Sequence, residues 1–260
     1  MYAVFEAEER LQTEPFRKNN LEMGDLSLGK IGGNQTHQTE PPVRRENVRD
    51  NSGAEGQWTE RPAHSRTPSV GPMITEKIGS YSLFVQGFRD ANVPDSEKVL
   101  RELRGSFQGI DLQLLRADRV AGKEHLVFSA RNAVDSFQSS YRRAKHLSME
   151  FLLFASGEHQ IIEAIKLLGV TASSKELALV GLSETSLDAS LLSNRAMESV
   201  RGTPDDTVLQ IKTKKKVEDL KRAYNILDEE LNASKMPSEE DNSVLKRLII
   251  ERSALLALEN

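Results

Sequence analysis

Short runs rich in apolar and β-branched residues mark the strands that this chain is expected to form. SYSLFVQGF at 80–88 and ELALVGLS at 176–183 are such runs, and polar residues bound each of them. IDLQLLRADRV at 110–120 predicts a third strand, and a weaker signal at 207–212 predicts a fourth. The intervals between these segments do not follow the regular alternation of strand and helix that is typical of a parallel sheet.

Apolar residues at helical spacing fill the intervals between the strands. Pro94 and Asp95 precede the segment 96–107, which is a usual signal for a helix start. Gly157 and Gly169 each follow a helical run, and we expect both at the position just after a helix end. Runs of helix between few strands predict the α+β class. The other predicted helices span 125–137, 147–155, 160–168, 188–200, 214–231 and 241–258.

Residues 1–72 differ from the rest of the chain. Pro, Gly, Asn, Ser and Gln dominate this tract, and aliphatic residues are sparse. Such a segment buries too little apolar surface to offset the entropy lost on ordering, so it is expected to be a disordered tail. Because an ordered pattern begins at Met73, the alternative is a misassigned translation start. Residues 73–260 are expected to form one domain.

Composition and charge narrow the function classes. Hydrophobic residues make up 38% of the chain and charged residues 28%, and the formal net charge is -4. Because there is no overall basic excess, any contact with nucleic acid has to come from a local patch. Cysteine is absent, which excludes disulfides and thiolate metal sites. No apolar run reaches the roughly 18 residues of a membrane span, and no secretory signal is evident, so we expect a cytoplasmic protein, or a nuclear one in a eukaryote.

The residue types used in catalysis are not arranged as an active site or a metal site. The five histidines show no HxH or HExxH spacing, and no GxSxG, GxxxxGK[ST] or GxGxxG motif occurs. We therefore expect a protein that is not an enzyme and that uses no metal and no cofactor. The alternative is an enzyme of unrecognised mechanism, with His125, His146 or His159 as its acid–base groups.

A basic cluster, YRRAKH at 141–146, lies between two apolar helical runs. Arg142, Arg143 and Lys145 can converge there with backbone N–H groups of the next helix, which suits a phosphate backbone. The alternative is an ordinary solvated connection between helices.

The junction SGEHQI at 156–161 is the second candidate RNA contact. Gly157 after Ser156 permits close approach of a ligand to the backbone. With His159 and Gln160, the exposed N–H groups of the next helix can hold a phosphate or a base edge. The alternative is a glycine-capped corner with no ligand.

Two further segments carry more charge or more apolar surface than a simple helix needs. Lys212, Lys214, Lys215 and Lys216 precede a helical run, where solvated lysines are the ordinary interpretation and an anionic partner is the alternative. The last helix, 241–258, has apolar residues on more than one stripe, so it is buried on two sides or binds a partner. The predicted partner contacts are Leu245, Leu248, Ile249, Arg252, Leu255 and Leu256.

The most distinctive letters are HLVFSARNAVDSFQ, LSMEFLLFASGEHQIIEAIKLLGV and ELALVGL, between residues 125 and 182. Together they resemble the kinase-binding subunit of the KEOPS complex. His125-Leu126, Glu150 and the Ser156-Gly157 junction stand where that family's pattern has them. His159 is a departure, because the family pattern has an arginine before the glutamine.

The resemblance implies a non-catalytic subunit with a small, mostly antiparallel sheet packed with several helices. Such a subunit binds and stimulates the kinase/ATPase subunit of KEOPS and holds the 3′ CCA end of tRNA. The complex makes threonylcarbamoyl-adenosine next to the anticodon, and a separate transferase subunit, which this protein meets only indirectly, carries out the transfer. The kinase contact is expected on the last helix, joined by 96–107. A protein-only adaptor that does not bind RNA is the alternative.

Overall fold

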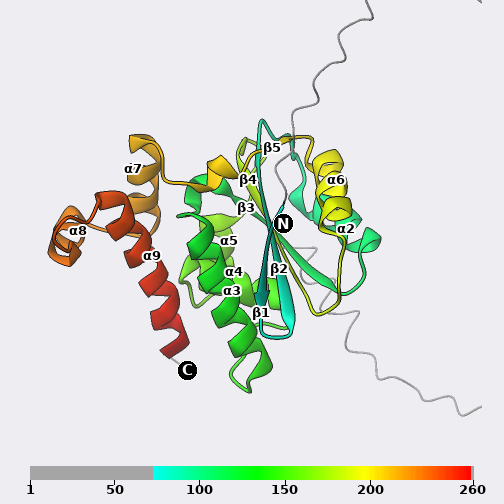
Figure 1. Cartoon of the computed structure of the whole chain (residues 1–260), viewed down its shortest axis with the longest axis horizontal. Helices are drawn as coiled ribbons and strands as arrows, with labels where there is room; N and C mark the ends of the chain where they lie inside the picture. Colours follow the sequence, from blue (N-terminus) through cyan, green and yellow to red (C-terminus); the bar gives the residue numbers. More distant parts are fainter. Residues whose placement is uncertain (1–72, 259–260) are drawn as a thin grey trace, which may run out of the picture. The chain divides into compact units, whose positions relative to one another are not determined.

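The computed structural model describes residues 73–258, and the predictions for residues 1–72 lie outside that range. A five-stranded sheet runs through the described residues in the order β1-β2-β4-β3, with β5 paired to the end of β2 (Figure 1). Every pairing in it is antiparallel, so the predicted α+β class with a mostly antiparallel sheet is confirmed. The strands are β1 (Ile74–Ile78), β2 (Tyr81–Arg89), β3 (Ile110–Arg116), β4 (Leu177–Ser183) and β5 (Thr203–Pro204).

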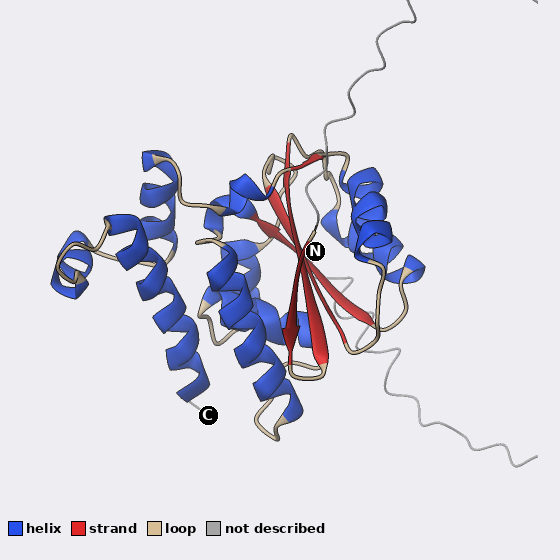
Figure 2. Cartoon of the chain, viewed as in Figure 1, coloured by secondary structure: helices blue, strands red, loops and turns tan. Residues whose placement is uncertain are grey.

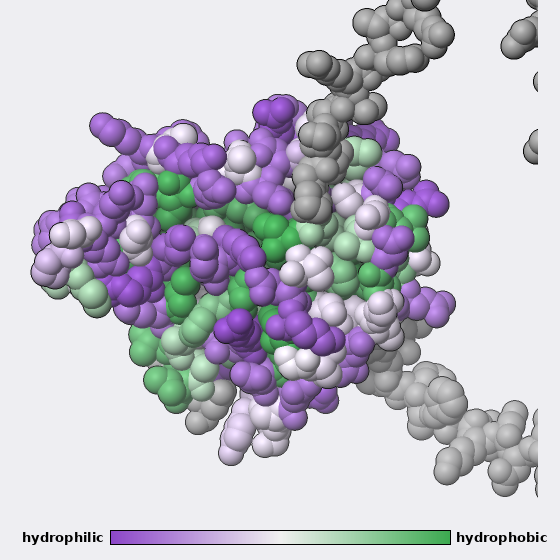
Figure 3. All heavy atoms as spheres, viewed as in Figure 1, coloured by the Kyte–Doolittle hydropathy of each residue, from purple (hydrophilic) through white to green (hydrophobic). Residues whose placement is uncertain are grey.

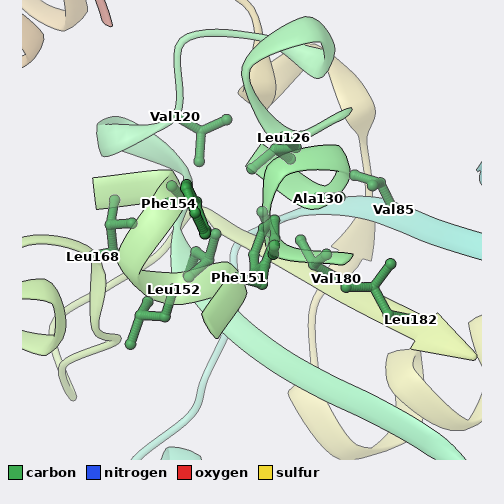
Figure 4. Packing of buried hydrophobic residues seen from close by; sticks show 14 of the residues in the cluster. Val85, Val120, Leu126, Ala130, Phe151, Leu152, Phe154, Leu168, Val180 and Leu182 are labelled. Atoms are coloured by element: carbon green, nitrogen blue, oxygen red, sulfur yellow. The ribbon is translucent and has the colours of Figure 1, made fainter. Parts of the chain in front are cut away.

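Helices cover both faces of this sheet (Figure 2). α2 (Ser96–Ser106) and α6 (Ala189–Val200) pack on one face, and α3 (Lys123–Gln138) and α4 (Leu147–Ser156) pack on the other. Because side chains alternate across a strand, Leu83 and Val85 join the core under α3 and α4, and Phe84 joins the core under α2. Figure 4 shows Leu126 of α3 and Phe151 of α4 in the first of these cores.

The helices after β5 form a third apolar cluster. α9 (Asp241–Leu258) lies between two pairs of helices, with α3 and α4 on one side and α7 (Lys214–Ala223) and α8 (Asp228–Ser234) on the other. This position accounts for the apolar surplus of its sequence, because both sides of the helix are covered by the chain itself. Figure 1 shows α9, in red, running beside α3.

Three predicted elements differ from the structure. The strand predicted at 110–120 ends at Arg116, where the 3-10 turn η1 (Ala117–Arg119) begins. The helix predicted at 214–231 is two helices, α7 and α8, because the chain breaks at Asn225, which has a φ of 50°. Neither Gly nor Pro marks that break in the sequence.

The strand predicted at 207–212 is wrong. Asp206–Leu209 is the 3-10 turn η2 instead. Two carboxylates hold the turn, since Asp205 accepts from Thr207 N at 2.9 Å and Asp206 accepts from Gly87 N at 2.7 Å. Short polar side chains that bond to nearby backbone favour turns over strands, and here one of them also ties the turn to β2.

The two glycines predicted at helix ends have different roles. Gly157 follows α4 with a φ of 69°, the left-handed conformation expected of a glycine cap. Gly169 follows α5 (Ile161–Leu168) with a φ of -65°, so it is not a left-handed cap. There glycine is required for close approach, because a Cβ atom would lie 2.4 Å from the carbonyl oxygen of Ile165.

Candidate functional site

Glu150 in α4 fixes the loop that carries the predicted RNA-binding cations, residues 139–146, called here the basic loop. Its side chain is fully buried, and its carboxylate accepts three hydrogen bonds. One comes from the Ser136 hydroxyl of α3 at 2.7 Å. The other two come from the backbone N–H groups of Arg143 at 3.0 Å and Ala144 at 2.7 Å. A satisfied buried carboxylate rigidifies what it binds, so the basic loop has a defined shape.

The two adjacent arginines of the basic loop point to different surroundings. Arg142 is exposed, and its guanidinium lies over the Phe137 ring at 5.5 Å. Arg143 is half-buried, donates to the carbonyl oxygen of Leu256 in α9 at 2.6 Å and lies 5.7 Å from the centre of the Phe154 ring. Arg143 therefore anchors α9, whereas Arg142 and the exposed Lys145 present their side chains at the surface.

The predicted second contact, residues 156–160, is called here the glycine corner. Ser156 is buried, and its hydroxyl donates to Leu153 O at 2.9 Å while accepting from Glu158 N at 3.2 Å. Ser156 and Gly157 therefore build the turn. His159 and Gln160 are exposed and stand just before α5, so they are the members of the corner that a ligand can reach.

The basic loop and the glycine corner meet the same helix. Arg143 bonds to Leu256, and a Cβ atom on Gly157 would lie 3.2 Å from the Cβ of Arg252. Arg252 and Leu256 are one turn apart on α9, so they share a face of that helix. The structure thus brings the two candidate RNA contacts together along the second half of α9, a proximity that sequence alone did not give.

A buried pair of aromatic side chains supports the glycine corner from beneath. The carbonyl oxygen of Ala155 accepts from His125 Nε2 at 2.8 Å and from the Tyr224 hydroxyl at 3.1 Å. His125 Nδ1 accepts from Ala121 N at 3.2 Å, which fixes the proton on Nε2. Burial lowers the pKa of His125 to about 4, so the ring is neutral at pH 7. His125 is therefore a positioning residue, and the role of Tyr224 was missed because it lies 69 residues from Ala155 in the sequence.

The partner contacts predicted on α9 fall into two groups. Four of them are buried inside the chain: Leu245, Leu248, Ile249 and Leu256. Arg252 is half-buried and pairs with Glu230 of α8 at 3.1 Å. Leu255 is 53% exposed, and Leu258, one turn further, is 80% exposed. Figure 3 shows apolar atoms gathered near the end of α9, so the surface left for a partner is its last turn.

α2, the helix predicted to join α9 in the kinase contact, packs on the other face of the sheet. α2 turns its apolar stripe, Val99, Leu100 and Leu103, into the core of the opposite sheet face. Its exposed side is charged, with Lys98 and Arg101 among its members. Any contact that α2 makes with a partner would therefore be polar, and a shared apolar surface with α9 is not formed by the described residues.

Residues 73–258 contain neither a metal-holding cluster nor a membrane-spanning helix. No group of three or more His, Asp or Glu side chains is placed to hold a metal ion in this range. Within the same residues, no helix has the length and apolar character needed to cross a bilayer.

Comparison with known proteins identifies relatives of this chain. Residues 91–257 match the family model described as "Kinase binding protein CGI-121". A protein of Methanocaldococcus jannaschii, named "Regulatory protein Cgi121", is 33% identical over 120 residues. That alignment covers 44% of this chain and 74% of the relative. The family match includes the basic loop, the glycine corner and all but the last residue of α9.

Proposed function

The chain belongs to the CGI-121 family of kinase-binding proteins, and from that premise we propose that it is a non-catalytic subunit of the KEOPS complex. In this proposal it binds and stimulates the kinase/ATPase subunit and recruits tRNA by its 3′ CCA end for threonylcarbamoyl-adenosine modification. It meets the transferase subunit only indirectly. The observation that carries the proposal is the family match across the segment that holds both candidate surfaces.

The kinase surface is assigned to the last turn of α9. Most of this helix is buried, yet Leu255 and Leu258 remain 53% and 80% exposed. Leucines on one turn that residues 73–258 leave uncovered suit the anchors of a helix that binds a partner. Arg143 fixes the backbone of this turn through Leu256 O, so the anchors are held in place before a partner arrives.

A pair of single variants tests this surface. Leu255→Asp is expected to weaken binding to the purified kinase subunit by about tenfold or more, because a charge replaces an apolar anchor that the bound kinase would cover. Leu191→Asp is the matched control, since Leu191 is 50% exposed but lies on α6, across the sheet. Equal binding by both variants in a titration calorimeter would remove the last turn of α9 from the proposal.

The RNA surface is assigned to the exposed members of the basic loop and the glycine corner. Arg142, Lys145, His159 and Gln160 reach solvent, whereas Arg143, Ser156 and Gly157 hold the backbone that carries them. Cationic and amide side chains beside a helix start suit a phosphate and an unpaired base. His159 supports phosphate binding less strongly than the arginine of the family pattern would.

A tRNA mobility shift tests this face. The double variant Arg142→Glu/Lys145→Glu leaves the anchor Arg143 in place and is expected to weaken binding about tenfold or more. Lys98→Glu/Arg101→Glu is the control, because it changes the net charge equally but lies on α2, on the opposite face of the sheet. A tRNA without its CCA end should bind the wild type and the double variant alike.

The protein-only adaptor is the second candidate, favoured by the net charge of -4. It predicts kinase binding with no tRNA affinity at physiological salt. If the wild type does not bind tRNA, the adaptor replaces the RNA part of the proposal and leaves the kinase part intact. If Arg142→Glu/Lys145→Glu binds tRNA as well as the wild type does, only the assignment of the RNA face is overturned.

A further inference from the structure

A cleft of about 820 Å³ lies away from both candidate surfaces. The end of β3, the loop 171–176, the turn η2 and the first turn of α7 line it. No residue of the basic loop, the glycine corner or α9 is among its lining residues. Its volume falls within the range of small-molecule sites, about 300–1,000 Å³. Three lysines of the run at 212–216, namely Lys212, Lys215 and Lys216, line this cleft.

Lys216 is the central cation of the cleft. It is only 8% exposed, and its ammonium group donates to the carbonyl oxygen of Val208 at 2.6 Å. Among residues 73–258, no carboxylate oxygen lies within the 4.0 Å that defines an ion pair with it. Burial lowers its pKa to about 8, and the more distant Glu176 and Asp118 oppose this only in part. A buried ammonium with one partner has two N–H groups left for a ligand.

The charges around Lys216 leave the cleft with a positive excess. Its other cations and carboxylates largely neutralise each other in three ion pairs, Arg116–Asp118, Lys215–Asp219 and Arg89–Asp205. Lys175, Lys212 and Lys216 have no ion pair among the described residues, and Glu176 is the carboxylate that remains to oppose them. Three cations against one anion lining a cleft attract an anionic ligand.

Neutral hydrogen-bond donors complete the lining. Thr213 caps α7 by accepting from Lys216 N at 3.1 Å, and Thr213, Lys215 and Lys216 at the start of that helix line the cleft. Thr171 and Ser174 face the cleft from the loop, where their hydroxyls lie 3.1 Å apart. Ammonium groups and hydroxyls are usual donors to phosphate oxygens.

We propose that this cleft, here called the lysine cleft, is a phosphate-binding site with Lys216 at its centre. The phosphate belongs either to a free nucleotide or to the backbone of a bound RNA, since both present the same oxygens. The proposal does not depend on kinase binding or on the RNA surface assigned above, because it uses none of their residues.

The test is a calorimetric titration of the full chain with inorganic phosphate and with AMP at constant ionic strength. Saturable binding of either is expected. Lys216→Met keeps the buried stem and removes the charge, and it should weaken binding about tenfold, the size expected for one charge-assisted contact. Lys214→Met is the matched control, because Lys214 is an exposed neighbour in the same helix turn that does not line the cleft, and it should change affinity less than about twofold.

Each result of this titration either overturns the phosphate site or supports it. No binding, or equal loss in both variants, overturns the site and leaves only non-specific attraction. If Lys216→Met does not fold, Lys212→Met replaces it, since Lys212 is exposed and lines the cleft. Competition of tRNA with bound phosphate, lost in the Lys216 variant, supports the site and assigns the phosphate to RNA. Retention of AMP in the presence of tRNA supports the site and assigns it to a nucleotide.

Discussion

Glu150 and Lys216 are both buried and both of a charged residue type, but their surroundings differ. Glu150 lies between α3 and the basic loop, and three N–H and O–H groups surround its carboxylate. Lys216 lies at the first turn of α7, with one carbonyl partner and an open cleft beside it. The carboxylate is fully used by the fold, and the ammonium is not.

The comparison distinguishes a buried charge that stabilises the fold from a buried charge that is available to a ligand. Desolvating a charged group costs several kcal/mol unless hydrogen bonds or a partner offset the loss. At Glu150 the protein itself supplies the offset, so the group stabilises a loop. At Lys216 a single carbonyl oxygen offsets only part of the desolvation cost of the ammonium. An anionic ligand in the cleft would offset the rest. The following predictions test the two halves of this contrast.

The largest effect is expected at Glu150. Glu150→Met keeps a side chain of similar length but removes both carboxylate oxygens, so the three donors around them lose their acceptor. Leaving buried backbone N–H groups of Arg143 and Ala144 unsatisfied should lower the free energy of unfolding by about 3 kcal/mol. Urea unfolding measures this. Glu163→Met is the control, since Glu163 is exposed on α5 and its carboxylate pairs with Lys166, and its effect should stay below about 0.5 kcal/mol.

The next largest loss of stability is expected at Arg143, and it should exceed the loss at the adjacent Arg142. Arg143→Met breaks the hydrogen bond to Leu256 O and should cost about 2 kcal/mol, because a hydrogen bond from a charged donor in a half-buried site is lost. Arg142→Met removes only an exposed contact with Phe137 and should cost about 0.5 kcal/mol. Hydrogen exchange should also speed up over the last turns of α9 in the first variant alone. Similar losses in both variants would mean that Arg143 does not anchor that helix.

Local signals in the sequence were sufficient for most of the fold. Asp95 caps α2 by accepting from Lys98 N, and Val99 and Leu103 form its buried stripe, as the pattern predicted. Gly157 ends α4 as expected, because the left-handed conformation it adopts is a local property. The wrong strand prediction came where a distant group decides the local structure, because η2 is tied to β2 by the hydrogen bond that Gly87 N donates to the Asp206 carboxylate, 119 residues away.

The candidate site was harder to predict for the same reason. The letters YRRAKH place three cations together but do not say which way each side chain turns. Glu150, seven residues on, and Leu256, 113 residues on, orient Arg143 inward and leave Arg142 outside. Similarly, the apolar surplus of α9 correctly indicated burial on two sides. It could not show that α7 and α8 of the same chain supply the second side and leave only the last turn for a partner.

Lys216 should make stability depend on pH in a narrow alkaline window. The folded pKa of about 8 lies below the usual value of 10.5, so between these values the unfolded chain holds the proton and the folded chain has released it. Stability from this group therefore rises with pH, by about 1 kcal/mol from pH 8 to pH 9. The measurement is the difference in urea unfolding between wild type and Lys216→Met, in which other titrations cancel. A flat difference would mean that the ammonium is better solvated than its burial implies, and saturating phosphate should flatten it if the lysine cleft binds an anion.

The smallest effect tests whether the Glu150 site depends on its full set of donors. Ser136→Ala removes one of the three hydrogen bonds to the carboxylate and leaves both bonds to the basic loop in place. The loss should be about 0.5–1 kcal/mol, the net worth of a single hydrogen bond, because the remaining donors still satisfy the charge. Ser129→Ala in the same helix is the matched control, since its hydroxyl bonds only to His125 O one turn back. If Ser136→Ala instead cost as much as Glu150→Met, the three hydrogen bonds to Glu150 would act as one cooperative unit, unlike the single hydrogen bond of Lys216.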